Sequence, residues 1–306
     1  MRMRTLVAVV ALGLVAGAGC QQSDAEQAAD IVLGAGSTQE QRLLAAMTVA
    51  ALERAGITVD ARLDLGDTRG LRREAMGGRI DLYWDYTGAA WALGLRQESP
   101  VADVDESFEL VRSADRGRGL EWLTPTQANA TLALFVRAES LSADDAGEDA
   151  GGMQWLARTL SRGDASLCAD SDFIARPGGL DDFATLYGIN LEQLDVVAAS
   201  EAEAIDAVAA GECFAGLATA TSGAARLNGL APVADDRKVF PAFVVAPVAR
   251  ARVLDRVEGL DGALRAVSER LRTEDLAELN GLVAAGGDIE QVAQDYVNSV
   301  LGPVPT

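Results

Sequence analysis

Four aromatic side chains lie within the eleven residues from Asp81 to Trp91, in a chain that is only 5% aromatic. The segment reads DLYWDYTGAAW, so Tyr86 follows a carboxylate at the end of an apolar run. An aromatic ring attracts a cation to its face, by about 0.5–2 kcal/mol for each contact. Because ligands of α/β proteins bind where strands end, Tyr86 is a candidate cation-binding ring. The alternative is a strand whose aromatic residues pack in the core. Asp81 and Asp85 are expected to cap or pair locally.

The chain contains no histidine. This excludes catalysis by Ser-His-Asp and Cys-His arrangements and removes the usual zinc ligand. No segment has the pattern of a convincing nucleophile elbow, so the chain lacks the residues that a hydrolytic active site would need. We therefore expect a protein that is not an enzyme and that uses no cofactor and no metal.

The segment VLGAGSTQ places Gly34 and Gly36 between an expected strand and an expected helix, with Asp60 at the end of the next strand. This spacing matches the start of a dinucleotide-binding fingerprint, but Gln39 stands where the third glycine is required. The signal for a nucleotide is therefore weak. The start of the helix still offers unpaired N–H groups that suit a ligand carboxylate or another anion.

Short apolar runs alternate with helical periods along the chain, which predicts a mostly parallel sheet covered by helices. Capping boxes are predicted at Thr38 with Gln41 and at Ser200 with Glu203. Strands are expected at 31–36, 57–63, 79–86, 130–138, 165–170, 188–199, 213–221, 230–236 and 242–249. Helices are expected at 37–56, 68–78, 153–161, 178–188 and 200–211, and from 250 onward with breaks near 273 and at 286–287.

The N-terminus has the organisation of a secretory signal. Arg2 and Arg4 precede an apolar run at 6–14, and small residues then lead to Cys20. The apolar stretch is shorter than the about 20 residues that span a membrane. We therefore expect the chain to be exported.

A cysteine directly after small residues resembles a bacterial lipoprotein signal. Residues 1–20 are predicted to be a lipoprotein signal peptide, with lipid on Cys20, and the polar residues 21–30 a flexible tether. Gly17 stands where Leu or Val is usual, and plain secretion is the alternative. The expected location is extracytoplasmic, with the chain lipid-anchored to the bacterial cell membrane.

The chain carries a formal net charge of −20. Nucleic acid is a poor partner for such a chain, because it requires a basic surface. An anionic membrane surface would also repel the protein, which suits attachment through a lipid. The acidity serves solubility or provides a field that attracts cations, and both interpretations stay open. A monomer is expected.

Cys168 and Cys213 remain as an even pair once Cys20 is assigned to lipid. Each lies in a short apolar run, and exported proteins fold in an oxidising compartment. A disulfide between them is predicted, and two buried free thiols are the alternative.

Five ordered segments resemble the substrate-binding proteins of ABC transporters for quaternary ammonium compounds, the glycine betaine/carnitine/choline osmoprotectant family. The resemblance covers nearly the whole mature chain, and GGRIDLYWDYTGAA carries its most specific part. The other segments are LGAGSTQEQ, TPTQANATLALFV, SDFIARPGGLDDFATLYG and LAPVADDRKVFPAFVVAPV. The resemblance implies a receptor that binds a cationic or zwitterionic small molecule and presents it to an ABC permease.

The resemblance also implies the fold, a two-lobed α/β periplasmic-binding-protein fold of type II. Two crossing strands join the lobes, and the ligand cleft lies between them. The first lobe is expected to comprise 31–133 and 241–306, and the second 134–240. Closure of the lobes over the ligand would present the loaded form to the permease.

Members of the family hold the trimethylammonium group in a cage of aromatic rings, and a Lys and an Arg hold the ligand carboxylate. By resemblance, Tyr86 falls on one cage ring, and Phe243 falls where a second tyrosine is common. Arg176 falls on the carboxylate-binding arginine. These three residues are therefore candidates for ligand contact.

Other positions of the chain depart from the family pattern. Leu132 and Thr219 fall where cage tyrosines are common, Ser222 falls where an Asp is usual, and Gly36 falls where the carboxylate-binding lysine is usual. The loss of two rings is expected to weaken binding of the family's ligand some tens of times, at about 1 kcal/mol each. Trp84 or Trp91 could supply a replacement ring.

Four polar side chains that the resemblance brings to the cleft suggest a pocket richer in hydrogen bonds than the family's. They are Thr219, Ser222, Asn129 and Ser37. Two alternatives follow from the missing rings. One is the same fold binding a different, more polar small molecule. The other is a binding module for sensing or scaffolding whose cleft has degenerated.

Overall fold

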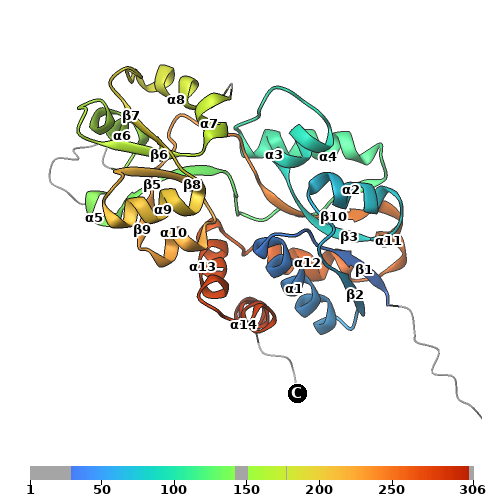
Figure 1. The fold of residues 1–306 in the computed structure, drawn as a ribbon. Helices are drawn as coiled ribbons and strands as arrows, with labels where there is room; N and C mark the ends of the chain where they lie inside the picture. Colours follow the sequence, from blue (N-terminus) through green and yellow to red (C-terminus); the bar gives the residue numbers. More distant parts are fainter. Residues whose placement is uncertain (1–28, 142–150, 177, 303–306) are drawn as a thin grey trace, which may run out of the picture.

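Each of the two lobes is a twisted five-stranded sheet with helices on its faces (Figure 1). The computed structural model describes residues 29–141, 151–176 and 178–302. The first sheet has the strand order β2-β1-β3-β10-β4, and the second has the order β7-β6-β8-β5-β9. The first sheet consists of β1 (Ile31–Gly34), β2 (Val59–Arg62), β3 (Leu82–Tyr86), β4 (Leu120–Trp122) and β10 (Val245–Arg250). The second consists of β5 (Leu132–Arg137), β6 (Ser166–Ala169), β7 (Asp195–Ala198), β8 (Ala215–Thr219) and β9 (Leu230–Pro232).

Both sheets are mixed, whereas the sequence pattern predicts mostly parallel pairing. In the first sheet β1 pairs in parallel with β2 and β3, and β10 runs antiparallel to both β3 and β4. In the second, β6 pairs in parallel with β7 and β8, and β5 runs antiparallel to β8 and β9. The antiparallel members β5 and β10 are the strands that follow the two segments crossing between the lobes. Apolar periodicity reports burial and says nothing of strand direction.

The first lobe buries both faces of its sheet, because successive side chains of a strand point to opposite sides. Ile31 and Leu33 pack with α1 and α12, while Val32 packs on the other side with Leu71 of α2. Figure 1 shows α1 and α12 on one side of this sheet and α2, α3 and α4 on the other. The helical elements are α1 (Gln39–Arg54), α2 (Thr68–Met76), α3 (Thr87–Ala89), the π-helical turn η1 (Ala90–Gly94), α4 (Val104–Arg116), α11 (Ala251–Arg256), α12 (Leu260–Ser268), α13 (Thr273–Ala284) and α14 (Ile289–Leu301).

The second lobe follows the same rule. Leu134 and Val136 of β5 pack with α6 and α8, and Ala133 and Phe135 pack with α9 and α10. The helices are α5 (Ala138–Leu141), α6 (Met153–Leu160), α7 (Ser171–Ala175), α8 (Leu180–Tyr187), α9 (Glu201–Ala210) and α10 (Gly223–Leu227).

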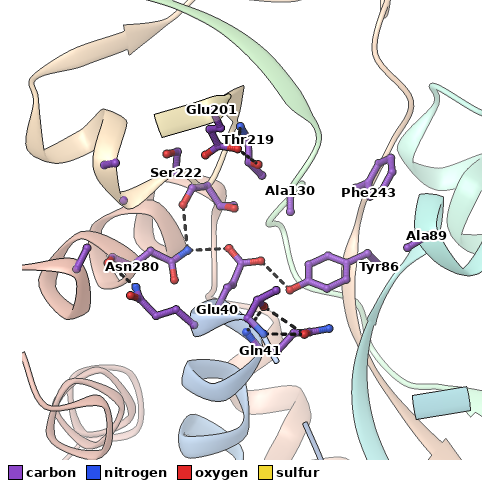
Figure 2. A pocket seen from close by; sticks show the side chains of 16 residues that line it. Glu40, Gln41, Tyr86, Ala89, Ala130, Glu201, Thr219, Ser222, Phe243 and Asn280 are labelled. Atoms are coloured by element: carbon purple, nitrogen blue, oxygen red, sulfur yellow. Dashed lines mark hydrogen bonds between the residues drawn. The ribbon is translucent and has the colours of Figure 1, made fainter. Parts of the chain in front are cut away.

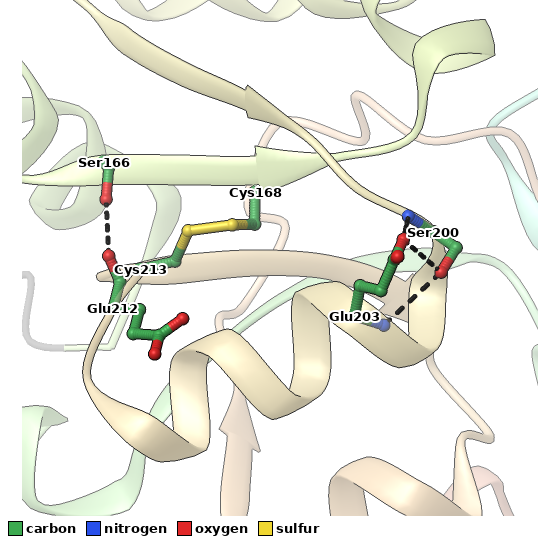
Figure 3. Close-up of a disulfide and its surroundings, with 6 residues drawn as sticks. All are labelled: Ser166, Cys168, Ser200, Glu203, Glu212 and Cys213. Atoms are coloured by element: carbon green, nitrogen blue, oxygen red, sulfur yellow. Dashed lines mark hydrogen bonds between the residues drawn. A yellow bond between two sulfur atoms is a disulfide. The ribbon is translucent and has the colours of Figure 1, made fainter.

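A disulfide joins Cys168 in β6 to Cys213, two residues before β8 (Figure 3). The Cα atoms are 6.0 Å apart, and both cysteines are buried in the second lobe. This confirms the predicted disulfide and rejects the alternative of two free thiols.

Two short segments cross between the lobes side by side. Asn129 forms an antiparallel bridge with Val244, and the N–H of Ala130 donates to the carbonyl of Phe243 at 3.0 Å. The Asn129 Oδ1 atom accepts a 2.7 Å hydrogen bond from the Phe243 N–H. The side chain of Asn129 therefore reinforces the crossing itself.

Helix α13 makes a further connection between the lobes. Its Leu276 and Leu279 pack in the first-lobe core with Leu43 and Met47 of α1. On its other side it lies against α10, where a Cβ atom on Gly223 would come within 2.4 Å of the backbone of α13. Only glycine allows this close approach of the two helices.

The predicted helix caps and the local roles of the acids in the opening segment are confirmed. Thr38 and Gln41 form a capping box on α1, and Ser200 and Glu203 form one on α9. Asp81 pairs with Arg250 at 2.9 Å. The buried Asp85 accepts hydrogen bonds from the side chain of Thr68 and the N–H of Tyr86, both at 2.9 Å.

No helix of the described ranges is long and apolar enough to cross a membrane. The predicted signal peptide, with Cys20, lies outside those ranges, as does most of the predicted tether at 21–30. Asp30, at the end of the predicted tether, hydrogen-bonds the backbone and side chain of Thr58.

Candidate ligand-binding site

Two adjoining compartments lie between the lobes. The first has a volume of about 560 Å³ and the second about 420 Å³. Ala130 and Phe243 of the crossing segments and Thr219 at the end of β8 line both compartments. The compartments therefore meet at the residues that join the two lobes.

Two aromatic rings face the first compartment, Tyr86 from the end of β3 and Phe243 from the second crossing segment (Figure 2). Gly88 allows the position of Phe243, because a Cβ atom on Gly88 would lie 2.4 Å from a ring carbon. The two rings provide two faces on which a cationic group can rest.

The hydroxyl group of Tyr86 donates a 2.7 Å hydrogen bond to the carboxylate of Glu40, in the first turn of α1. Burial, and then the charge of Glu40, raise the pKa of Tyr86 well above its usual value, so the hydroxyl keeps its proton. The other carboxylate oxygen of Glu40 accepts from the side-chain amide of Asn280 at 2.7 Å. Figure 2 shows these three side chains linked in a row across the site.

The position expected for a carboxylate-binding lysine has no side chain. A Cβ atom on Gly36 would lie 2.0 Å from the side-chain oxygen of Gln41 and 2.6 Å from the carbonyl oxygen of Gly66. Because Gln41 is held in the capping box of α1, this space is filled. A side chain at position 36 would therefore clash with its neighbours in this structure.

The second lobe contributes a carboxylate to the opposite wall. The hydroxyl of Thr219 donates to a carboxylate oxygen of Glu201 at 2.8 Å, and the Thr219 N–H donates to the same oxygen at 3.2 Å. Glu201 lies in the first turn of α9. Ser222 also lines the compartment, where its side chain caps α10. Thr219, which by resemblance falls where the family has a cage tyrosine, thus holds the carboxylate of Glu201.

The first compartment is acidic. Glu40 comes from the first lobe and Glu201 from the second, and no Arg or Lys of the described residues lines the compartment. Within the described part of the chain, the partners of both carboxylates are uncharged. This wall favours positive charge.

The second compartment has a basic residue. Arg176 ends α7, and its Nε atom is buried and has no hydrogen-bond partner among the described residues. Trp91 and Leu132 line the same compartment, and the indole N–H of Trp91 donates to the carbonyl of Ser99 at 2.8 Å. An anionic group of a ligand can therefore reach a guanidinium group here.

Six of the eight predicted ligand-contact residues line one or both compartments. They are Tyr86, Phe243, Thr219, Ser222, Leu132 and Arg176. Ser37 is exposed beside the start of α1, and Asn129 serves the crossing. Neither of them lines a compartment. Of the two candidate replacement rings, Trp84 is buried in the first lobe with its N–H on Thr48 at 2.7 Å, and Trp91 faces the second compartment.

Glu40, Glu201 and Asn280 are among the lining residues that sequence reasoning missed. Both glutamates lie just after a predicted helix cap at the start of a helix that follows a strand. That position faces the ligand edge of an α/β sheet, so the signal was present. Asn280 reaches the site because α13 packs between the lobes, and sequence spacing gave no signal for it.

Known proteins share this architecture. The E. coli structure "Apo YehZ" superposes with a TM-score of 0.78 at 29% identity, covering 88% of this chain and 98% of the other. A structure described as a glycine betaine/carnitine/choline ABC transporter protein has a TM-score of 0.79 at 20% identity, covering 88% and 98%, and supports the fold alone. The two-lobed type II fold is therefore confirmed.

The sequence comparisons agree with the fold. A glycine-betaine-binding protein of Pseudomonas aeruginosa is 30% identical, over 92% of this chain and 91% of its own length. The glycine betaine-binding protein YehZ of E. coli is 29% identical, over 89% and 91%. Residues 29–299 match the model of the substrate-binding domain of ABC-type glycine betaine transport systems. Such domains bind solutes for transporters and are not enzymes. The chain therefore belongs to the family of substrate-binding domains of ABC-type glycine betaine transport systems.

Proposed function

We propose that this protein captures a quaternary ammonium or related zwitterionic compound between its lobes and delivers it to the permease of an ABC importer. The observation that carries the proposal is the pair of rings, Tyr86 and Phe243, on a compartment that adjoins the Nε of Arg176. This buried atom has no hydrogen-bond partner in the described part of the chain. Rings suit the cationic head, and the guanidinium suits a carboxylate. The family membership supports the same class of ligand.

Capture by closure fits the position of the two compartments. Their walls come from both lobes, so a ligand bound there makes contacts with both lobes at once. A ligand that binds the closed form more tightly than the open form shifts the protein toward the closed form. The size of the shift is set by the difference between the two binding free energies. The permease would then recognise the closed form.

The test is a binding panel on the purified mature chain. Glycine betaine, choline, carnitine, proline betaine and ergothioneine are compared by thermal shift and calorimetry. A ligand that binds only the folded protein raises the melting temperature, because it stabilises by RT ln(1 + [L]/Kd). If no member of the panel shifts the melting temperature, the ligand class is wrong while the fold stands.

Arg176→Ala tests the role of the guanidinium within that panel. Carboxylate-bearing ligands are expected to bind more weakly to the variant, and choline is expected to be spared. Arg162→Ala, an exposed arginine in the turn after α6, is the matched control. Equal weakening across both ligand types would contradict the proposed role.

A more polar small molecule is the second candidate ligand. Thr219, at a position where a cage ring is expected, makes hydrogen bonds to Glu201, and Leu132 stands at another such position. Binding of polar amino compounds with no response to methylated ammonium compounds would favour this ligand. A cleft that binds nothing, in a strain without an adjacent permease gene, would favour a sensing module.

We further propose that the protein is extracytoplasmic, monomeric and anchored by lipid on Cys20. The signal-like residues 1–20 support this, and so does the family, whose members serve importers. We propose lobes at 31–133 with 241–306, and at 134–240. Sheet membership supports this division to within two residues, since β5 of the second sheet begins at Leu132. Cys20→Ser is expected to abolish labelling by radioactive palmitate and release the protein from membranes.

A further inference from the structure

The two glutamates of the first compartment approach it from opposite lobes. Glu40 lies in the first turn of α1 in the first lobe, and Glu201 lies in the first turn of α9 in the second lobe. Both line the compartment together with Tyr86 and Phe243, as Figure 2 shows. A ligand between the lobes therefore lies between two carboxylates as well as beside two rings.

Both carboxylates line this space and are held in place by hydrogen bonds. Glu40 is held by the Tyr86 hydroxyl and the Asn280 amide, each at 2.7 Å. Glu201 is held by Thr219 alone among the described residues. A carboxylate has about four acceptor sites, so each still has capacity for a ligand donor. Each glutamate also lies in the first turn of a helix, whose positive end attracts negative charge.

By the resemblance, one cage ring of the family is replaced in this chain by a charge. Thr219 stands where a cage tyrosine was expected, and it positions Glu201 instead. A fixed carboxylate attracts a cation at least as strongly as an aromatic face does. Unlike a ring, however, the carboxylate of Glu201 repels a carboxylate group on the ligand. Arg176, which could offset that repulsion, lies in the neighbouring compartment and does not line this one.

We propose that Glu40 and Glu201 clamp the ligand's cationic head between the lobes and make the receptor select ligands of net positive charge over short zwitterions. The favoured ligand class is a quaternary ammonium alcohol, with choline as its simplest probe. The proposal rests on the proposed function, since it names which member of the ligand class this compartment takes. Without a cation between them, the two carboxylates oppose the approach of the lobes.

The experiment compares choline with glycine betaine by calorimetry at fixed pH and ionic strength. For the unmodified protein, choline is expected to bind about tenfold more tightly than glycine betaine. Glu40→Gln and Glu201→Gln are each expected to weaken choline binding about fivefold to tenfold and to leave glycine betaine unchanged or improved. Raising the salt concentration is expected to weaken choline binding and to affect glycine betaine less.

Glu290→Gln is the matched control, because Glu290 also lies in the first turn of a helix, α14, away from both compartments. Glu201 is exposed, so Glu201→Gln keeps the proposal testable if Glu40→Gln fails to fold. Glycine betaine binding as tightly as choline overturns the clamp and leaves the proposed function intact. Equal weakening of both ligands by the glutamate variants also overturns it. No binding by any quaternary ammonium compound overturns the proposed function and the clamp together.

Discussion

Replacing Tyr86 by Leu tests whether the ring is a cation-binding face, because leucine keeps apolar bulk and removes the π-face. The ring is half-buried, and its hydroxyl is fixed on Glu40 at 2.7 Å, so its face toward the compartment is held in place. A partly exposed cation–π contact contributes about 1 kcal/mol, which corresponds to a change in Kd of about fivefold. Phe243→Leu is expected to have a similar effect. The double variant is expected to lose about 2 kcal/mol, or roughly thirtyfold.

The assay pairs choline with its neutral isostere, 3,3-dimethylbutan-1-ol, in which a carbon atom replaces the ammonium nitrogen. The two ligands have the same shape, and only the first has a charge for a ring to attract. Each ring variant is expected to weaken choline binding by the amounts above and to change binding of the isostere little. Phe214→Leu is the control, since Phe214 packs against Trp155 in the second lobe.

Equal weakening of both ligands would refute the reasoning, because it would show that the rings supply only apolar contact. A fall in melting temperature with unchanged choline affinity would instead return Tyr86 to the role of a core residue. Tyr86 packs against the first-lobe core, so the melting temperature is measured for every variant.

Three further predictions concern the framework of the site. Replacing both Cys168 and Cys213 by Ala is expected to lower the free energy of unfolding of the second lobe by about 4 kcal/mol, as for a loop with a sequence separation of 45. Urea denaturation with and without reductant measures this, and a reductant effect that persists in the variant would contradict it. Burial raises the pKa of Asp85 to about 7, above its value in the unfolded chain. The folded protein therefore binds the proton more tightly, and the free energy of unfolding is expected to fall as the pH rises from about 4 to about 7. The fall is about 1.4 kcal/mol per pH unit, and an Asp85→Asn variant with the same pH profile as the unmodified protein would count against it. Gly223→Ala is expected to lower stability by at least about 1 kcal/mol through overpacking against α13, whereas Gly262→Ala, where a Cβ atom meets nothing, is expected to be tolerated. Equal melting temperatures for these two variants would show that α10 can move away at no cost.

Much of the fold was predictable because local chemistry determines it. Thr38 and Ser200 predict the starts of α1 and α9, because each has a partner three residues later that completes a capping box. The disulfide was predictable from an even pair of cysteines in apolar runs. Strand direction was not predictable in this way, because the crossing between lobes reverses β5 and β10.

The site was predictable where a residue type carries its own chemistry. The resemblance names Tyr86, Phe243 and Arg176 as ligand contacts. All three line the compartments, and their contact with a ligand stays a prediction. Asn129 was expected at the ligand site but lines neither compartment. Its side chain instead accepts a hydrogen bond from the backbone of Phe243 in the crossing segments. Asn280 depends on the packing of α13 between the lobes. Residue type and spacing do not encode contacts of that kind.

The location of Glu40 and Glu201 has a consequence for how such receptors diverge. A ring in a cage must be packed from behind, so a change of ring alters the core of a lobe. A glutamate in the first turn of a helix needs no such support, and the end of the helix favours it whatever the ligand. On the proposed clamp, a substitution at the exposed Glu201 would change which solute is favoured while the core of the second lobe stays intact. A new solute preference would then require few mutational steps.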